Sequence, residues 1–442
     1  MPIDNKKYLP YDIADKIPSA RLEEGGVCAP AEFAASAVYC GIKRAGYPEN
    51  AVTPEAILTN DNIQNNHKPD VALIVSETDC AAAAVYTQNL VKGAPVTVCR
   101  EHLRDGRARA VIVNSGNANT CNADGVQKAK MMCALTAAAF KIPVEDVLVA
   151  STGVIGQPFP IEPVAAAVPY LAGGLKKDGS PAARAIMTTD TVSKEAAVSF
   201  ELSGKRVTVG AMCKGSGMIH PNMATMLCFA TTDADISSDM LDKAIRHATH
   251  RSFNMLSVDG DTSTNDMFAV LANGRAGNPR IEAENDDFVT FQAALTEICQ
   301  SLCLLMARDG EGATKLIVCN VSGADDEESA RKCAKSVICS PLCKSAMFGR
   351  DANWGRILCA VGYAGADIDP DAINVSIQSA AGSVAVCGNG RGVPFSEEEA
   401  LKILSEDRID VTVSLGGSEH EAAAYGCDLT YDYVKINGDY RT

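Results

Sequence analysis

From about residue 70 onward, short apolar segments with the composition of buried strands alternate with segments of helical pattern. Residues 70–76 and 81–87 are predicted strands joined by a short polar turn, and residues 108–114 form a third. A loop rich in Gly, Asn and Ser follows, then a helix that ends near Phe140, then a short apolar strand at 145–151. This order of strand, loop, helix and strand predicts a layered α/β architecture.

The middle of the chain continues this alternation. Residues 196–202 and 205–212 flank Ser203-Gly204, which is a strong signal for a β-hairpin. Residues 226–232 have the composition of another buried strand, and apolar residues recur at helical spacing over 286–307. We interpret this apolar stripe as core packing and not as a cofactor site.

Segments with β-like patterns recur in the last hundred residues, at 373–378, 382–388, 409–415 and 431–437. An acidic stretch at 324–329 precedes them and is the expected boundary between two parts of the chain. The sequence therefore predicts a larger catalytic part at about 1–323 and a smaller C-terminal α/β domain at about 324–442.

Charge and cysteine content limit the class of partner and the compartment. The 442-residue chain has a net charge of −15, whereas binding to nucleic acid or to an anionic membrane needs a basic surface. The N-terminus lacks the apolar core of a signal peptide, and no apolar run approaches the ~18 residues of a membrane span. The 17 cysteines are scattered without a C-x-x-C pair, which predicts buried, reduced thiols and no zinc site. We therefore expect a cytoplasmic protein.

Two segments have part of the pattern of a ligand-binding loop. Residues 388–392 (GNGRG) lie between short β segments with no helix after them, so we interpret them as a turn and not as a dinucleotide loop. The loop 259–266 has the aspartates of a calcium loop, but Thr264 and Val270 stand where that loop needs glycine and glutamate. We expect 259–266 to be a structural or substrate-facing polar loop.

The segment 214–227, KGSGMIHPNMATML, is the most informative in the chain. By itself it is a Gly- and Pro-rich loop that leads into a buried strand, where a β-branched threonine is ordinary. The segment resembles the self-cleavage signature of the ornithine acetyltransferase (ArgJ) family, the bifunctional glutamate N-acetyltransferases. The resemblance continues in family order through 26–43, 114–119, 151–156, 187–191, 257–266, 309–315, 348–357 and 437–442. It implies a self-processing DmpA/ArgJ-like catalytic fold, an α+β layered sandwich.

The resemblance implies self-cleavage between Ala224 and Thr225, which would give an N-terminal chain of residues 1–224 and a C-terminal chain of residues 225–442. Thr225 is then the nucleophile, and its new α-amine, with a pKa of roughly 8, can act as the base for its own hydroxyl. Attack on an amide builds negative charge on oxygen. In the family pattern, Thr152 and Gly153 supply the oxyanion hole through a hydroxyl and a backbone N–H.

The substrate-binding positions of the family correspond to Thr188, Lys214, Thr225, Glu311, Asn437 and Thr442. Thr188 is the threonine that we favour among 188, 189 and 191. Lys214 can pair with a substrate carboxylate and Glu311 with the ammonium groups of ornithine. Without the resemblance, both would be read as ordinary surface charges. Because Asn437 and Thr442 lie near the chain end, the tail must return to the active site.

The implied reaction moves the acetyl group of N2-acetylornithine to glutamate through an acetyl-threonine, with no metal or redox cofactor. Acetyl-CoA is a further candidate acetyl donor, whose use the sequence leaves open. The two fragments are expected to remain together as a heterodimer and to assemble into a heterotetramer. Two alternatives remain. One is a self-processing amidohydrolase or aminopeptidase, in which water resolves the acyl-enzyme, and the other is an uncleaved, non-catalytic binding protein.

Overall fold

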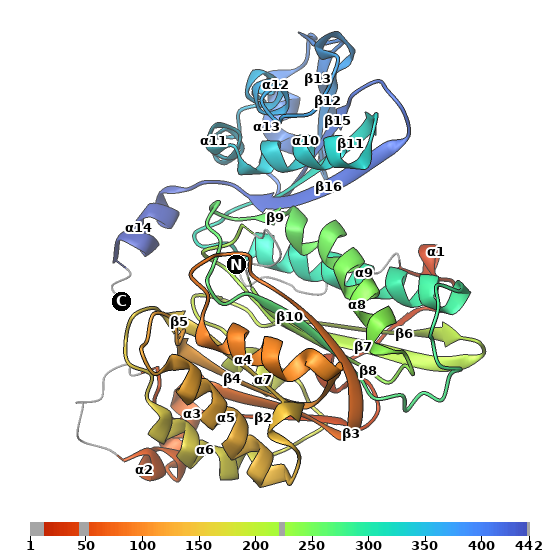
Figure 1. The fold of residues 1–442 in the computed structure, drawn as a ribbon. Helices are drawn as coiled ribbons and strands as arrows, with labels where there is room; N and C mark the ends of the chain where they lie inside the picture. The colour runs from red at the N-terminus through yellow and green to blue at the C-terminus, as the bar shows by residue number, and fades with distance from the viewer. Residues whose placement is uncertain (1–12, 44–52, 221–225, 440–442) are drawn as a thin grey trace.

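The computed structural model describes residues 13–43, 53–220 and 226–439. They form two mixed sheets with helices packed against them, which confirms the predicted α/β class (Figure 1). The first sheet belongs to a larger part of the molecule, and the second sheet belongs to a smaller part that contains most of the chain after residue 316 (Figure 1).

Nine strands of the described chain form the first sheet, in the order β1-β6-β7-β8-β10-β3-β4-β5 with β2 paired to β3. Strand β8 runs parallel to β10 and β4 parallel to β5, whereas the other neighbours are antiparallel. The strands are β1 (Arg21–Leu22), β2 (Phe33–Val38), β3 (Val71–Tyr86), β4 (Arg107–Asn117), β5 (Val147–Val154), β6 (Lys194–Leu202), β7 (Lys205–Lys214), β8 (Leu227–Thr232) and β10 (Met267–Ala272).

The second sheet has the order β14-β13-β12-β15-β11-β16-β9. Its strands are β9 (Leu256–Ser257), β11 (Leu316–Ala324), β12 (Asn374–Ser379), β13 (Gly382–Gly388), β14 (Arg391–Gly392), β15 (Arg408–Ser414) and β16 (His420–Cys427). The short β9 comes from the chain of the larger part and pairs with β16. This sheet therefore begins earlier in the chain than the acidic stretch at 324–329.

The α-helices of the described chain are α1 (Ile13–Lys16), α2 (Pro54–Leu58), α3 (Asp61–Asn66), α4 (Ala94–His102), α5 (Gly125–Phe140), α6 (Ile161–Gly173), α7 (Ser180–Ala185), α8 (Ser238–Arg251), α9 (Asp286–Arg308), α10 (Glu327–Cys339), α11 (Pro341–Gly349), α12 (Trp354–Gly362), α13 (Glu397–Ile403) and α14 (Tyr431–Asp439). Two hydrophobic cores meet at β8. Cys228 and Ala230 belong to the core that contains α8 and α9, whereas Leu227 and Phe229 belong to the other core. Strand β8 is thus buried on both faces, which explains its continuous apolar sequence.

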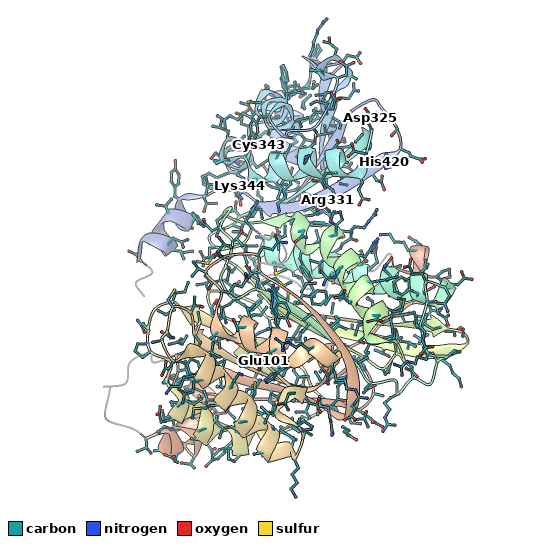
Figure 2. The ribbon with its side chains drawn as sticks, viewed as in Figure 1. Glu101, Asp325, Arg331, Cys343, Lys344 and His420 are labelled. Carbon is teal, nitrogen blue, oxygen red and sulfur yellow. The ribbon has the colours of Figure 1, made fainter. Side chains whose placement is uncertain are left out.

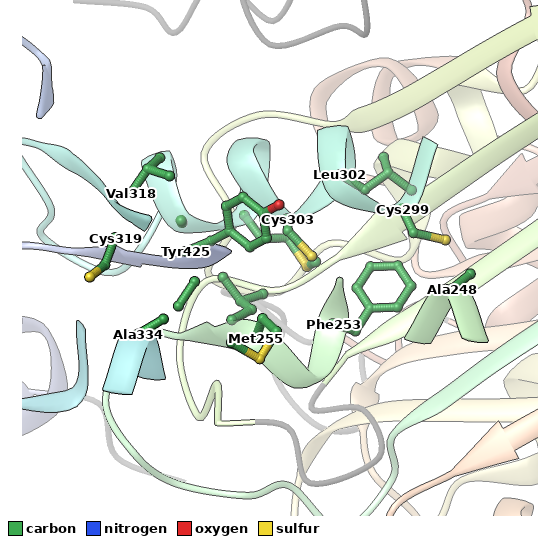
Figure 3. Packing of buried hydrophobic residues seen from close by; sticks show 14 of the residues in the cluster. Ala248, Phe253, Met255, Cys299, Leu302, Cys303, Val318, Cys319, Ala334 and Tyr425 are labelled. Atoms are coloured by element: carbon green, nitrogen blue, oxygen red, sulfur yellow. The ribbon is translucent and has the colours of Figure 1, made fainter. Parts of the chain in front are cut away.

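One hydrophobic core joins the two parts of the molecule. Figure 3 shows Phe253 and Met255 close to Cys299 and Leu302 of α9 and to Tyr425 of β16. Among the described residues, helix α9 is long and apolar enough to cross a membrane by length and mean hydropathy, but 61% of its most apolar window is buried inside the protein. We attribute its apolar character to this shared core, which needs apolar residues on most sides of the helix.

Most predicted elements are confirmed with shifted ends, and the hairpin is confirmed at Ser203 and Gly204, which both have positive φ. The predicted turn between residues 76 and 81 is wrong, because β3 continues through it as one strand with a bulge between Val75 and Cys80. Arg109 lies opposite the bulge and donates to the Glu77 carbonyl at 2.8 Å. Polar residues in an exposed stretch of strand thus have the composition of a turn.

The predicted strand at 431–437 is also wrong, because this segment forms α14. Strand β16 already occupies the place beside β11. The Tyr433 N–H donates to the Thr430 hydroxyl at 3.3 Å, which caps the first turn of the helix. Fourteen of the 17 cysteines are buried, as predicted, and Cys121 and Cys359 are exposed.

Candidate active site

A cavity opens where the ends of β5, β7 and the start of β8 meet the loop before β10. It has a volume of about 830 Å³, its open mouth included. Its lining residues are Ala118, Thr152, Gly153, Ile155, Thr188, Thr189, Lys214, Gly217, Met218, Ile219, Met226, Leu227, Ser263, Thr264, Asn265, Asp266, Glu311 and Asn437.

Six of the residues that the sequence predicted for the site line this cavity, namely Thr152, Gly153, Thr188, Lys214, Glu311 and Asn437. Thr189 lines it as well, whereas Thr191 instead donates to the Asp309 carboxylate. Ala224, Thr225 and Thr442 lie outside the described residues. Met226, which follows Thr225 in the chain, lines the cavity and is buried. The structure therefore places every predicted site residue that it describes around this one cavity.

Thr152 and Gly153 are positioned by the parallel pairing of β4 with β5, in which Gly153 lies opposite Gly116. Gly153 has a φ of +129°, and a Cβ built on it would lie 2.3 Å from the carbonyl carbon of Gly116. A side chain at this position is therefore excluded both by backbone conformation and by space. Glycine at 153 thus lets the end of β5 lie close to β4 at the wall of the cavity.

Lys214 ends β7 and belongs to a buried network of charges. Its Nζ lies 4.0 Å from Asp190, whose carboxylate also accepts hydrogen bonds from the Thr188 N–H at 3.0 Å and the Gly215 N–H at 2.7 Å. The side chain of Lys194 is fully buried between Asp190 and Asp309, at 2.7 and 2.6 Å. This network fixes the 187–191 loop, the end of β7 and the segment after α9 relative to one another.

Charge pairing determines the protonation of this network. Burial favours the neutral form of Asp190, but Lys194 and Lys214 outweigh it and hold the pKa of Asp190 below its usual range. Burial would lower the pKa of Lys194, yet Asp190 and Asp309 raise it to about 12. At neutral pH, Asp190 is therefore ionised and Lys194 is protonated. No local sequence signal indicates the pairing of Lys194 with Asp309, because these two residues are 115 positions apart.

Glu311 and Asn437 join the tail of the chain to the cavity. The Asn437 side-chain amide donates to Glu311 Oε2 at 2.8 Å, and the Glu311 N–H donates to the Ser216 carbonyl at 3.0 Å. A Cβ on Gly217 would lie 2.3 Å from the Glu311 carboxylate, so glycine at 217 makes room for it. Helix α14 thereby reaches the cavity through Asn437, and Figure 1 shows this helix leading away from the second sheet toward the chain end.

The polar loop before β10 contributes two buried residues that the sequence analysis did not single out. Asn265 donates to the carbonyls of Ala118 at 2.6 Å and Ser151 at 3.0 Å, which holds the residue before Thr152. Asp266 is 2% exposed, and its Oδ2 makes no hydrogen bond with a described residue. Burial raises the pKa of Asp266 well above its usual value, against the lowering effects of the Ser263 hydroxyl and Lys214. Only the polar composition of 259–266 could have indicated these roles.

The same loop holds the segment that precedes the predicted cleavage point. Asp259 accepts hydrogen bonds from the N–H groups of Met218 at 2.6 Å and Ile219 at 2.8 Å. The Thr262 hydroxyl donates to the His220 carbonyl at 2.8 Å. Among the residues that the structure describes, no group of three His, Cys, Asp or Glu side chains has the arrangement of a metal site.

Comparison with known proteins identifies the family to which this cavity belongs. The ArgJ family model matches residues 55–442. The chain belongs to the ArgJ family. It is 50% identical over 390 residues to the arginine biosynthesis bifunctional protein ArgJ 1 of Clostridium acetobutylicum, with 88% of this chain and 96% of that protein covered. The ArgJ protein of Symbiobacterium thermophilum is 49% identical over 420 residues, with coverage of 95% and 99%.

Solved ArgJ structures are also similar to this ArgJ-family chain. The crystal structure of the ArgJ protein from Bacillus halodurans has 43% sequence identity and a TM-score of 0.45, and the match covers 48% of this chain and 97% of that one. Family membership confirms the resemblance inferred from the segment 214–227. The roles of individual residues in the cavity stay predictions.

Proposed function

We propose that this chain is a glutamate N-acetyltransferase that moves the acetyl group of N2-acetylornithine to glutamate, with ornithine and N-acetylglutamate as products. One observation carries the proposal. Residues assigned from the family pattern come from five separate segments and line one cavity beside Met226. The names of the relatives, bifunctional proteins of arginine biosynthesis, support the same reaction.

The proposed nucleophile is Thr225, freed when the chain cuts itself after Ala224. The Thr225 hydroxyl attacks the acetyl carbonyl carbon of acetylornithine, and its proton passes to the new α-amine. The C–N bond then breaks and ornithine leaves with that proton, so an acetyl ester remains on Thr225. The amine of glutamate attacks this ester, and N-acetylglutamate leaves as the threonine hydroxyl is restored.

The described residues have distinct parts in this scheme. The Thr152 hydroxyl and the Gly153 N–H stabilise the oxyanion that forms on the acetyl oxygen. Lys214 binds the α-carboxylate of the substrate, and the buried Asp190 holds the end of β7 in place. Glu311 binds the ammonium end of ornithine, with Asn437 fixing the orientation of its carboxylate. Thr188 and the C-terminal Thr442 complete the substrate site.

The proposal also covers the subunit assembly and the cellular location of the enzyme. The two fragments remain together as a heterodimer that assembles into a heterotetramer in the cytoplasm. The partners are small molecules, and no metal or redox cofactor takes part. Acetyl-CoA serves as a second acetyl donor in this proposal, which the release of free CoA in the presence of glutamate would test.

Mass spectrometry tests the main proposal. The intact protein should give two fragments that meet between Ala224 and Thr225 in place of one species of 46.4 kDa. The variant Thr225→Ala should stay whole. Incubation with acetylornithine alone should add one acetyl group to the C-terminal fragment, and glutamate should remove it. Release of acetate at the same rate without glutamate would instead establish the amidohydrolase alternative, and an uncut wild-type chain would refute the self-processing scheme.

A further inference from the structure

A second cavity lies at the junction of the two parts of the molecule. It is bounded by the end of α8, the middle of α9, the first half of α10 and strands β15, β11 and β16 of the second sheet. Figure 2 shows Arg331 of α10 at this junction. The cavity has a volume of about 880 Å³, its mouth included, and shares no lining residue with the active-site cavity. Its main polar residues are Arg251, Gln300, Asn320, Arg331, Thr412 and Glu421.

Four side chains of the second sheet offer polar groups to this cavity. Asn320 of β11 lies in register with Thr412 of β15, and Ser322 lies in register with Glu421 of β16. In the described part of the chain, none of these four side chains makes a hydrogen bond or ion pair with another residue. Asn320, Ser322 and Thr412 are half-buried, and such polar groups normally have a partner, which here must be solvent or a ligand, whereas Glu421 lies exposed at the mouth.

The backbone of β16 is also open on this side. Strand β9 pairs only with Tyr425 and Gly426, so the described chain supplies no strand partner for residues 421–424 along that edge. Ala422 and Ala423 of this stretch line the cavity. Unpaired peptide groups at a sheet edge can donate to and accept from an extended ligand backbone.

Two guanidinium groups face the cavity from the helices. The side chain of Arg331 is only 12% exposed, its Nη1 donates to the His250 carbonyl, and its Nε lies 3.4 Å from Glu328, which leaves its Nη2 without a partner in the described part of the chain. Arg251 lies 3.0 Å from Glu327, and both side chains stay partly exposed. A guanidinium held in place at low exposure is a strong partner for a carboxylate.

The charges of the lining indicate the class of ligand. Two arginines are balanced by Glu327 and Glu421, so the lining has no net charge. A phosphate would meet two carboxylates, whereas a zwitterion finds both a cation and an anion. We propose that this cavity binds a free α-amino acid, with its carboxylate on Arg331 and its ammonium group on Glu421, and that binding is transmitted along α9 to the active site.

Helix α9 supplies the connection. Gln300 lines the second cavity, and its amide donates to the Arg251 carbonyl at 3.3 Å, which joins α9 to α8. Nine residues farther along, about 13 Å at helical rise, come Asp309 of the charge network and then Glu311 of the active site. A ligand that fixes α9 against α8 and α10 therefore acts on a rigid element that ends at the active site.

Calorimetry with L-arginine and L-glutamine as probes, and inorganic phosphate as the anion control, tests the binding. The variants Asn320→Leu and Thr412→Val keep side-chain size and remove hydrogen-bonding groups, and we expect each to weaken binding by about tenfold. Ser376→Ala, on the neighbouring β12 and outside the cavity, is the matched control and should bind as the wild type does. Lys214→Met alters the active site and should leave binding in the second cavity intact.

Amide hydrogen exchange tests whether binding in the second cavity is transmitted along α9. Calorimetry and hydrogen exchange both report on binding and do not depend on the proposed reaction. The bound amino acid should slow amide exchange over residues 301–311. Binding that is lost in Lys214→Met and kept in Asn320→Leu would place the ligand in the active site and overturn the proposal. Binding of phosphate alone would also overturn the proposal. So would the absence of binding by both amino acids at roughly 10 mM, a dissociation constant that corresponds to a binding free energy of about 3 kcal/mol. Binding with unchanged exchange at 301–311 would overturn the transmission along α9.

Discussion

Replacing Lys194 with methionine should destabilise the fold and impair the active site together. The fully buried ammonium group lies 2.7 Å from Asp190 and 2.6 Å from Asp309. Methionine has a similar length but no charge, so two ionised carboxylates would face one another in the protein interior. The nearest remaining cation is Lys214, whose Nζ is 4.0 Å from Asp190.

The magnitude follows from the partners that remain. Removal of one member of a buried ion pair costs about 3–5 kcal/mol, because an uncompensated charge stays buried. Asp190 keeps the N–H groups of Thr188 and Gly215, and Asp309 keeps Thr191. We therefore expect a loss of about 3 kcal/mol in the free energy of unfolding at pH 7, the low end of that range. Because Asp190 also positions Thr188 and the residue after Lys214, acetyl transfer should fall by about tenfold or more.

Urea unfolding followed by far-UV circular dichroism measures the effect, with the transfer assay run on the same preparations. Lys243→Met is the matched control, since it removes a pair with Glu284 at 2.5 Å in which the side chains are 53% and 61% exposed. We expect less than about 1 kcal/mol from the control. The double variant Lys194→Met/Asp309→Asn should recover part of the loss. If Lys194→Met costs no more than Lys243→Met, the network does not stabilise the fold and the reasoning is refuted.

Four further predictions concern the same site. Gly153→Ala should lower the free energy of unfolding by about 1–3 kcal/mol and abolish acetyl transfer. Gly156→Ala is the control, because Gly156 also has a positive φ but nothing lies within 4 Å of its Cβ, and it should keep activity. Thermal unfolding and the transfer assay check both variants. Asn437→Ala should raise KM for acetylornithine by about tenfold with a smaller change in kcat, as steady-state kinetics would reveal, because it removes the 2.8 Å bond to Glu311. Stability should fall as the pH rises from the ordinary Lys pKa of 10.5 through about 12, because the folded state raises the pKa of Lys194. It should fall again below the ordinary Asp pKa of 3.8, because the folded state lowers the pKa of Asp190. When unfolding midpoints are compared across pH, the alkaline loss should be smaller in Lys194→Met than in the wild type, since the loss from buried thiols with raised pKa values is common to both. Burial raises the pKa of Asp266, so its contribution to stability is lost as the pH rises above 3.8, and Asp266→Asn should unfold at a higher temperature than the wild type at pH 8 but not at pH 4.

Local pattern predicted the elements whose burial is uniform along the segment. Strand β8 and helix α9 were found because every position of the first, and a regular stripe of the second, lies in a core. The pattern failed at β3, where the bulge contains polar residues and exposes Glu77 and Asp79, and at α14, which packs too little to need an apolar stripe: Tyr431 is 83% exposed. Polarity alone does not distinguish a turn from an exposed stretch of strand.

The site was predictable only where a contiguous motif carried it. Thr152, Gly153 and Lys214 lie in segments with a recognisable family pattern, and the structure places them around one cavity. Lys194 and Asp309 form an equally specific arrangement, but their partnership spans more than a hundred residues and depends on the packing of α9 against β6. No sequence window contains both charges, so neither the pairing nor the protonation of the network follows from local sequence.

The order of the first sheet has a consequence for what the proposed cut would produce. Strands β8 and β10 would belong to the C-terminal fragment, yet they lie between β7 and β3, which would belong to the N-terminal fragment. The new fragment is thus hydrogen-bonded on both of its flanks to the other chain. Separating the two chains would require breaking the sheet at two seams in its middle, so subunit dissociation and global unfolding would be one event. Cleavage of a single peptide bond would give two covalently separate chains, and these chains would still fold and unfold as one cooperative unit.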